Sequence, residues 1–527
     1  MDWQLAASKK KSSLEAAIPP EWRIKPPTYD SVMSFPRQSG ILTEEELQIT
    51  ESSATQLVGD LAAGKLSSVA VTTAFCKRAA LAHQVTNCFH EFFPDMALAR
   101  AQYLDDYMAE HKKPIGPLHG LPISLKDQVR IKGLETTMGY ATWIGKKNTE
   151  DSVLTTLLLN AGAVLYVKTS VPQALMVGET INNVFGRTTN PRNKNLSCGG
   201  SSGGEGAILA LRGSVLGVGT DIGGSIRIPA AFNLLYGLRP SHGRIPYANM
   251  ANSMEGQETI HSVCGPLAHS VADMRLFVTS VLSQEPWLHD SKVIPMPWRQ
   301  SEEDTIKIKI GSGGLTLGYY FCDGNVLPHP PILRAIQTVT TKLSEAGHTV
   351  LPWGPYEHPS AIDLFMSIIG ADGGTVIQNI ADLTPATHSK LSINDLWDLH
   401  LRKWNYQCAY LSKIREFEKR IGRELDAIIA PVAPHAAIRH NQFKYYGYTT
   451  IVNLLDFTSV VVPVTVADRG VDVRNEVKSL SEVDAVVQGE YDPDVYHGAP
   501  VAVQIIGRRL TEERVMAIAE EVGRLLG

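Results

Sequence analysis

The chain has 527 residues, 44% of them hydrophobic and 20% charged, a balance that excludes intrinsic disorder and allows a large buried core. The formal net charge of −5 at pH 7 argues against nucleic acid as a partner, because nucleic-acid-binding proteins carry a basic surface. The six cysteines form no CxxC pair and show no zinc-binding spacing with histidine. This argues against a disulfide framework and a structural zinc, and it predicts free thiols in a reducing compartment.

The N-terminal segment predicts neither secretion nor a membrane anchor. Its lysines are not followed by the apolar run that a secretory signal needs, and the longest apolar runs, such as 460–466, are too short to cross a bilayer. We therefore expect a cytoplasmic protein that binds no membrane. Prolines are frequent in residues 1–40, which predicts an extended N-terminal arm before a single domain over residues 41–527.

Helices are predicted first in that domain, over residues 41–115, packed on its body. Thr43 and Glu46 have the spacing of a capping box, and further helical runs cover about 67–83 and 95–111.

Short apolar strands then alternate with helices. Strands are predicted at 121–126, 164–167, 307–311, 426–431, 459–467 and 499–507, with a closing amphipathic helix at 511–526. This alternation predicts an α/β fold with a mixed, mostly parallel sheet covered by helices on both faces. Residues 468–494 are charged and irregular, which predicts a surface excursion.

Two glycine clusters mark the centre of the sequence, GGSSGG at 199–204 and DIGGS at 221–225. Clustered glycine indicates backbone in conformations that other residues resist, or close approach to a ligand. Because each cluster also carries serine, the pair predicts a catalytic core.

The first cluster contains the pattern GxSxG twice, around Ser201 and Ser202, which is typical of the nucleophile of an α/β-hydrolase. That nucleophile follows a buried strand, whereas the residues before this cluster are polar and include Pro191. This hypothesis is therefore the weaker one.

The second cluster suits a nucleophile better. The backbone N–H groups of Ile222, Gly223, Gly224 and Ser225 could converge there into an oxyanion hole, with Ser225 beside the carbonyl carbon. An ordinary glycine loop that happens to contain a serine is the alternative.

A nucleophilic serine needs a base. His119, His242, His261 and His269 are available, but none lies in an informative motif. Lys126 ends an apolar strand, at the edge of the sheet where open α/β folds bind ligands. A lysine at such a position can also be a simple surface residue.

Three segments together resemble the amidase signature family: GLPISLKD at 120–127, CGGSSGGEGA at 198–207, and GVGTDIGGSIRIPAAFNLLYGLRPSHGR at 217–244. The resemblance implies a Ser-Ser-Lys triad of Lys126, Ser201 and Ser225, and a cis peptide bond between Gly200 and Ser201. Further segments along nearly the whole chain are similar to the fungal acetamidase-type general amidases of this family.

The resemblance also implies a mechanism. Unprotonated Lys126 accepts a proton from Ser201, which deprotonates Ser225 as that serine attacks an amide carbonyl. The oxyanion hole stabilises the tetrahedral intermediate, the relay runs backward to protonate the leaving amine, and water then hydrolyses the acyl-enzyme.

Five further residues are predicted near this triad. Ser202, Thr220, Asp221 and Arg227 are expected to support it, although loop-capping residues would look the same. Leu175 matches a pocket-lining position of the family, with core packing as the alternative.

The expected function is hydrolysis of carboxylic amides, with small aliphatic amides such as acetamide favoured and no cofactor or metal needed. A carbamate or aryl-acylamide hydrolase and a fatty acid amide hydrolase are alternatives within the family. An amidotransferase subunit or a catalytically silent acyl-binding protein is less favoured. The expected partner is a small-molecule amide, and the sequence leaves a homodimer open.

Overall fold

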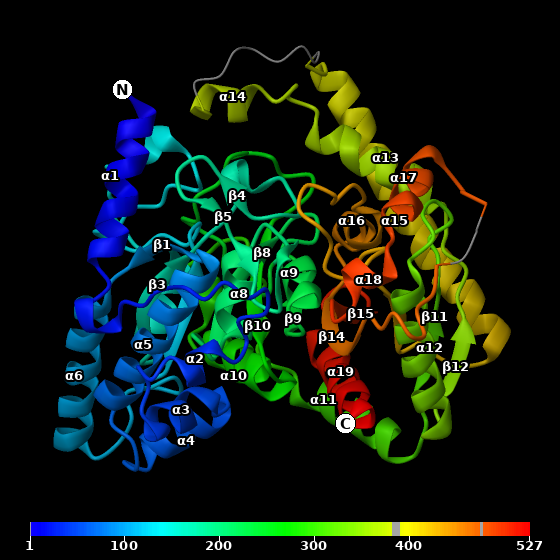
Figure 1. The fold of residues 1–527 in the computed structure, drawn as a ribbon. Coiled ribbons are helices and arrows are strands. Elements are labelled where there is room, and N and C mark those ends of the chain that lie inside the picture. The colour runs from blue at the N-terminus through cyan, green and yellow to red at the C-terminus, as the bar shows by residue number, and fades with distance from the viewer. Residues whose placement is uncertain (1, 382–389, 475–477) are drawn as a thin grey trace.

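The computed structural model describes residues 2–381, 390–474 and 478–527. Eleven strands form one sheet through the middle of the molecule, with helices packed around it (Figure 1). In order across the sheet the strands are β1 (Phe89–Phe92), β3 (Val164–Thr169), β2 (Pro122–Lys126), β8 (Leu216–Asp221), β10 (Val263–Ala268), β9 (Tyr236–Arg239), β14 (Ser459–Val466), β15 (Pro500–Ile506), β13 (Ala427–Pro431), β11 (Thr316–Tyr319) and β12 (Thr349–Pro352). Two small two-stranded sheets pair β4 (Ile181–Asn182) with β5 (Gly186–Arg187), and β6 (Thr189–Asn190) with β7 (Asn193–Ser197).

The predicted α/β class and mixed sheet are confirmed, but the expectation of a mostly parallel sheet is wrong. Pairing is parallel along β3–β2–β8 and along β13–β11–β12. It is antiparallel between β1 and β3 and along the central run β8–β10–β9–β14–β15–β13. A strand buried on both faces reads as a continuous apolar run whatever its direction, so the sequence pattern carried no information on this point.

The predicted helices near residues 43, 67–83, 95–111 and 511–526 are all present, and the capping box of Thr43 and Glu46 forms as expected. The α-helices are α1 (Trp3–Ala16), α2 (Phe35–Gln38), α3 (Glu44–Glu51), α4 (Ala54–Ala62), α5 (Ser68–Thr86), α6 (Pro94–His111), α7 (Val153–Asn160), α8 (Gly203–Ala210), α9 (Arg227–Phe232), α10 (Val271–Leu282), α11 (Gln300–Gly311), α12 (Pro330–Glu345), α13 (His358–Ile369), α14 (Thr375–Ala381), α15 (Ile393–Ile421), α16 (Gly447–Leu455), α17 (Glu482–Glu490), α18 (Pro493–Tyr496) and α19 (Glu512–Leu526). Within the described ranges, no helix has the length and apolar content needed to span a membrane.

The N-terminal residues 1–40 are not extended throughout, because α1 occupies much of their first half (Figure 1). Asp2 caps this helix through its carboxylate, which accepts from the N–H groups of Gln4 and Leu5. Ala7 and Leu14 lie two turns apart on its buried side. The prolines that suggested an extended arm all come after this helix.

Two other segments differ in secondary structure from the prediction. Residues 307–311 belong to α11 rather than to a strand: Ile306 is buried whereas Ile308 is 74% exposed, so the alternation of isoleucine and lysine does not mark a sheet face. The nearest strand is β11, which begins at Thr316, after α11 has ended. The surface excursion at 468–494 contains α17, although it has no strand among its described residues.

An ion-pair network is buried beside the sheet. The ammonium group of Lys168 on β3 lies 3.0 Å from a carboxylate oxygen of Asp127, and His90 Nδ1 lies 3.0 Å from the other oxygen. The N–H groups of Thr137 and Met138 donate to Asp127 as well. Burial raises the pKa of Asp127, but the charges of Lys168 and His90 and these hydrogen bonds outweigh it and hold that pKa below its usual range.

We expect Lys168→Met to lower the free energy of unfolding by about 3–5 kcal/mol, because it leaves the Asp127 carboxylate buried without its cation. Urea unfolding would measure the change. Lys147→Met is a matched control, since this lysine is exposed and its replacement should alter stability by less than about 0.5 kcal/mol. Equal unfolding midpoints for the two variants would contradict the prediction.

Candidate active site

Lys126 is the last residue of β2, which lies between β3 and β8 in the parallel part of the sheet. Its side chain is fully buried. The ammonium nitrogen donates to Ser201 Oγ and to Thr220 Oγ1, each at 2.7 Å. The structure therefore brings the lysine and the first predicted serine into direct contact, and it excludes the alternative of a surface lysine.

The pKa of Lys126 is lowered to about 7. Burial is the main cause, because it disfavours the charged ammonium form, and the negative charges of Asp221 and Glu205 offset only part of the effect. Near neutral pH a large fraction of this amine is therefore unprotonated and able to accept a proton from the hydroxyl that it contacts.

The first glycine cluster places its two serines between β7 and α8. The peptide bond between Gly200 and Ser201 is cis, which confirms the expectation from the resemblance. A Cβ atom at Gly200 would lie 2.6 Å from the carbonyl oxygen of Val177, so only glycine fits there. Ser202 donates its N–H to the carbonyl oxygen of Ser225 at 3.2 Å, which joins the two clusters.

The second cluster is a loop held by the carboxylate of Asp221, the last residue of β8. This carboxylate accepts from the N–H groups of Gly224, at 2.9 Å, and Ile226, at 3.2 Å. It also accepts from Arg227 Nε at 3.1 Å and from Arg227 Nη2 at 3.0 Å. The loop from Asp221 to Arg227, which carries Ser225, is thus held at both ends by the same carboxylate.

The Asp221–Arg227 pair is completely buried and fully hydrogen-bonded. Arg227 also donates to Asn453 at 2.7 Å and to Gln504 at 3.1 Å. Burial raises the pKa of Asp221, but the charge of Arg227 and its hydrogen bonds bring that pKa below its usual range. The Asp221 carboxylate therefore stays ionised where it contacts the loop.

The prediction of four converging N–H groups is wrong for Gly224, because its N–H is bonded to Asp221. Among the described residues, no acceptor contacts the N–H groups of Ile222, Gly223 and Ser225. These three remain available to bind an oxyanion.

The other predicted supporting residues lie between the two clusters. The N–H of Thr220 donates to Ser202 Oγ at 3.3 Å. Thr220 Oγ1, which accepts from Lys126, donates in turn to Gln128 Oε1 at 2.7 Å. Sequence reasoning missed Gln128, because a glutamine two residues beyond the strand carries no recognisable signal.

Glu205, the second residue that sequence reasoning missed, lies in the first turn of α8 and is fully buried. Its carboxylate accepts from Ser124 Oγ at 2.6 Å and from Thr169 Oγ1 at 2.7 Å. Burial raises its pKa to about 7. A buried carboxyl group and a buried amine, both with pKa values near neutrality, thus interact within the same site.

The four candidate histidines make other contacts. His242 and His261 stack on each other, with ring centroids 3.8 Å apart. His119 Nδ1 contacts the N–H of Ile115, and His269 Nε2 contacts the carbonyl of Leu209. None of these four rings bonds to a serine of either glycine cluster.

Ser225 lines a mostly apolar cavity of about 80 Å³. Four of the predicted substrate-binding residues share this wall: Leu175, Ile222, Gly223 and Ser225. A second, narrower cavity of about 20 Å³ lies beside it, and Ser201 and Ser225 both line that space. The larger cavity therefore offers a small, mostly apolar space directly beside the Ser225 hydroxyl.

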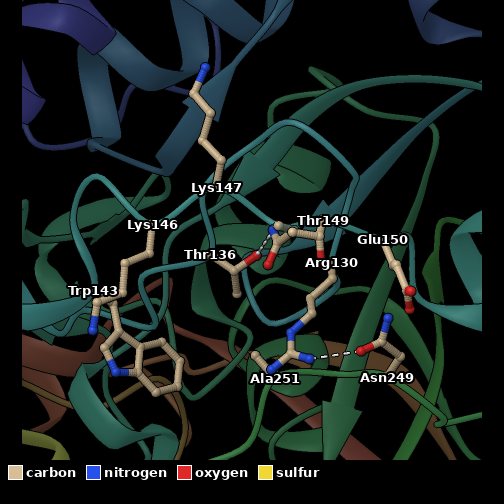
Figure 2. Close-up of a pocket in the computed structure, with 10 residues that line it drawn as sticks. Arg130, Thr136, Trp143, Lys146, Lys147, Thr149, Glu150, Asn249 and Ala251 are labelled. Carbon is tan, nitrogen blue, oxygen red and sulfur yellow. Dashed lines mark hydrogen bonds between the residues drawn. The ribbon is translucent and has the colours of Figure 1, made fainter.

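A wider cavity of about 410 Å³ lies elsewhere, and its lining residues are drawn in Figure 2. Arg130 Nη1 donates to Asn249 Oδ1 at 2.7 Å there, and Lys147 points away from the other lining side chains (Figure 2). None of the predicted site residues lines it. The smaller cavity at Ser225 is therefore the candidate active site.

The comparison with known families agrees with this geometry. Residues 70–516 match the profile of the family described as Amidase, a span that contains Lys126, Ser201 and Ser225. The chain belongs to the amidase family. It is an amide hydrolase.

Among curated relatives, an acetamidase of Emericella nidulans is 65% identical, with 100% of this chain and 98% of the relative covered. An acetamidase of Aspergillus oryzae is 61% identical, with 100% and 99% covered. Among solved structures, a fatty acid amide hydrolase superposes with a TM-score of 0.94 at 35% identity, covering 100% of this chain and 95% of that one. The amidase resemblance and the fold predicted from it are confirmed.

We expect the pKa of Lys126 to be near 7 in solution. NMR of protein labelled with ¹³C at lysine Cε would report it, and the resonance that disappears in Lys126→Met assigns it. In Glu205→Gln the pKa of Lys126 should fall further, because the negative charge of Glu205 raises it. A Lys126 resonance that titrates near the free-lysine value of ~10.4 would contradict the expectation.

Proposed function

We propose that this amidase hydrolyses small aliphatic amides, acetamide among them, through a relay of Lys126, Ser201 and Ser225. The single observation that carries the proposal is the buried hydrogen bond of 2.7 Å between Lys126 Nζ and Ser201 Oγ. It joins an amine whose pKa is near 7 to a hydroxyl that shares a cavity wall with Ser225.

The first step needs a base. The neutral amine of Lys126 accepts the proton of Ser201, and Ser201 takes the proton of Ser225 as the Ser225 oxygen bonds to the amide carbon. The carbonyl π bond breaks in this step and its electron pair moves to oxygen. Thr220 and Gln128 orient the lysine, since Thr220 accepts from its ammonium group and donates to the glutamine.

The developing oxyanion binds the N–H groups of Ile222, Gly223 and Ser225. Asp221 does not contact the oxyanion; it holds the loop through Gly224 and Ile226. The carbon–nitrogen bond then breaks, the proton returns along the relay to the leaving ammonia or amine, and an ester of Ser225 remains. Water follows the same route and releases the acid. The relay uses only side chains and backbone of this chain.

The substrate class rests on the relatives and on the cavity. The chain is at least 61% identical to two fungal acetamidases over its full length. The cavity of about 80 Å³ is small and mostly apolar, which suits a short acyl group, and Phe365 of α13 is one of the residues that line it. A Cβ atom at Gly223 would lie 3.6 Å from the Phe365 ring, so this ring stands directly beside the loop.

The six free cysteines support a reducing, cytoplasmic location for the enzyme.

The proposal is tested by Ser225→Ala, which should lower kcat/KM for acetamide by roughly 10⁴-fold or more, because a relay loses nearly all its effect with its nucleophile. A fluorophosphonate should label the wild type at Ser225, as located by peptide mass spectrometry. Lys126→Arg should also be inactive, because arginine does not release its proton in a protein.

Ser202→Ala is the control, since it should retain the label at Ser225. A label on Ser201 or Ser202 in the wild type would revive the α/β-hydrolase hypothesis. Near-normal activity of Lys126→Arg would contradict the lysine relay.

We expect Phe365→Ala to raise kcat/KM for hexanamide relative to acetamide by at least about 10-fold, since each methylene that fits a pocket contributes about 1–3 kcal/mol. A series of unbranched amides from acetamide to octanamide would measure the shift. Met366→Ala should change this ratio less, because Met366 is 54% exposed at the cavity rim. A wild type that prefers octanamide would overturn the proposed substrate class.

A further inference from the structure

Within the described part of the chain, Ser225 lines two cavities, and a third adjoins one of them. The first is the mostly apolar cavity of about 80 Å³ that Phe365 also lines, here called the acyl cavity. The second is the narrow space of about 20 Å³ that Ser201 also lines, here called the neck. The third, here called the outer cavity, has a volume of about 310 Å³ and is lined by residues between 242 and 292.

The neck and the outer cavity share part of their walls. Among the described residues, Asn252, Met254 and Ser262 line both spaces, and none of these three lines the acyl cavity. The N–H of Met254 donates to Asn252 Oδ1 at 3.1 Å, which joins two of the three. Met254 has the longest side chain among them, and an unbranched thioether chain adapts its shape readily. This residue is therefore suited to set the width of the path from Ser225 to the outer cavity.

The proposed relay decides which part of a substrate faces the neck. In the tetrahedral intermediate the loop N–H groups bind the former carbonyl oxygen, whereas the leaving nitrogen must come within about 3 Å of Ser201 Oγ to receive its proton. Within the described chain, Ser201 lines the neck and not the acyl cavity. The nitrogen therefore faces the neck while the acyl chain lies in the acyl cavity. A substituent on that nitrogen continues through the neck into the outer cavity.

The outer cavity carries an excess of negative charge. Its described lining residues include three carboxylates, those of Glu255, Glu258 and Asp290, and one ammonium group, that of Lys292. Lys292 pairs with Glu258 at 2.5 Å, and Arg130 lies 3.9 Å from Glu255, at the outer limit of an ion pair. The Asp290 carboxylate accepts only from backbone N–H groups among the described residues, so no side-chain cation balances it.

Two histidines in the same wall do not cancel this excess. The rings of His242 and His261 stack with their centroids 3.8 Å apart. Burial, together with the neighbouring His242, lowers the pKa of His261 to about 4, and burial also lowers the pKa of His242. Both rings are therefore neutral at pH 7. The outer cavity thus favours a polar or cationic group and disfavours an anionic one.

We propose that the enzyme also hydrolyses secondary amides that join a short acyl group to an amine with a cationic chain, and that this chain lies in the outer cavity. The inference rests on the proposed relay and adds the substrate class on the amine side. The carbon–nitrogen bond breaks, the nitrogen takes its proton from Ser201, and water then releases the acid from Ser225. One amide and one water thus yield one carboxylic acid and one amine.

Two substrates of similar length and opposite charge test the proposal on the full chain. N-(3-aminopropyl)acetamide carries an ammonium group at pH 7, whereas N-acetyl-β-alanine carries a carboxylate. The wild type should show a kcat/KM for the cationic amide at least about 10-fold higher, because the charge of the cavity attracts one chain and repels the other. Added salt should reduce this preference, since it screens the interaction. Glu255→Gln combined with Glu258→Gln should reduce it by about 3-fold, as two partly exposed charges allow.

The width of the neck is tested separately. Met254→Trp should lower kcat/KM for N-(3-aminopropyl)acetamide relative to acetamide by at least about 10-fold, because a larger side chain narrows the path for the amine substituent. Met96→Trp is the matched control, since Met96 is exposed on α6, and it should leave this ratio as in the wild type.

The outcomes separate this inference from the proposed function. A wild type that hydrolyses acetamide but neither secondary amide would overturn the inference and leave the proposed function standing. Equal kcat/KM values for the cationic and anionic amides would overturn it as well, as would an unchanged ratio in Met254→Trp. A wild type that does not hydrolyse acetamide would contradict the proposed function, and this inference with it.

Discussion

The active site depends on a buried amine whose hydrogen-bond partners are hydroxyl groups. Lys126 donates to Ser201 and Thr220 and, among the described residues, forms no ion pair. Lys168 on the adjacent strand is equally buried, but its ammonium group contacts the Asp127 carboxylate. Direct contact with a carboxylate stabilises an ammonium ion, whereas a hydroxyl can accept from the ammonium form and donate to the neutral amine. One lysine is thereby suited to structure and the other to proton transfer.

A second constraint fixes the loop that this amine serves. The Asp221 carboxylate accepts hydrogen bonds from Gly224, Ile226 and Arg227, so charge-assisted hydrogen bonds help to hold the loop conformation. The arrangement assigns separate tasks to neighbouring N–H groups. Some bind the permanent anion beneath the loop, and others face the cavity.

The sequence was most informative where a chemical group ends a simple pattern. Lys126 closes an apolar strand, and glycine clusters surround Ser201 and Ser225, so these positions could be predicted together with the amidase resemblance. Glu205 could not be predicted, because an acidic residue in the first turn of a helix is also what the helix dipole favours. The binding of the Gly224 N–H to a side chain likewise leaves no trace in residue order.

The fold, like the site, could be predicted only in part. Burial and helical periodicity identified most strands and helices, since they follow directly from the spacing of apolar residues. Strand direction did not follow, because the central antiparallel run is as apolar as the parallel ends. The segment 307–311 was misassigned since isoleucine alternates with lysine there while only one side of a helix is buried.

The hydrogen bond between Arg227 and Gln504 joins residues 277 positions apart in the chain. A ribosome adds about 5–20 residues per second, so roughly 14–55 s pass between synthesis of the arginine and of its partner on β15. Throughout that interval the nascent chain already contains Lys126, Ser201 and Ser225, yet the support beneath its nucleophile loop is incomplete. The support beneath the nucleophile loop is therefore completed only after β15, whose Gln504 supplies this bond, has been synthesised.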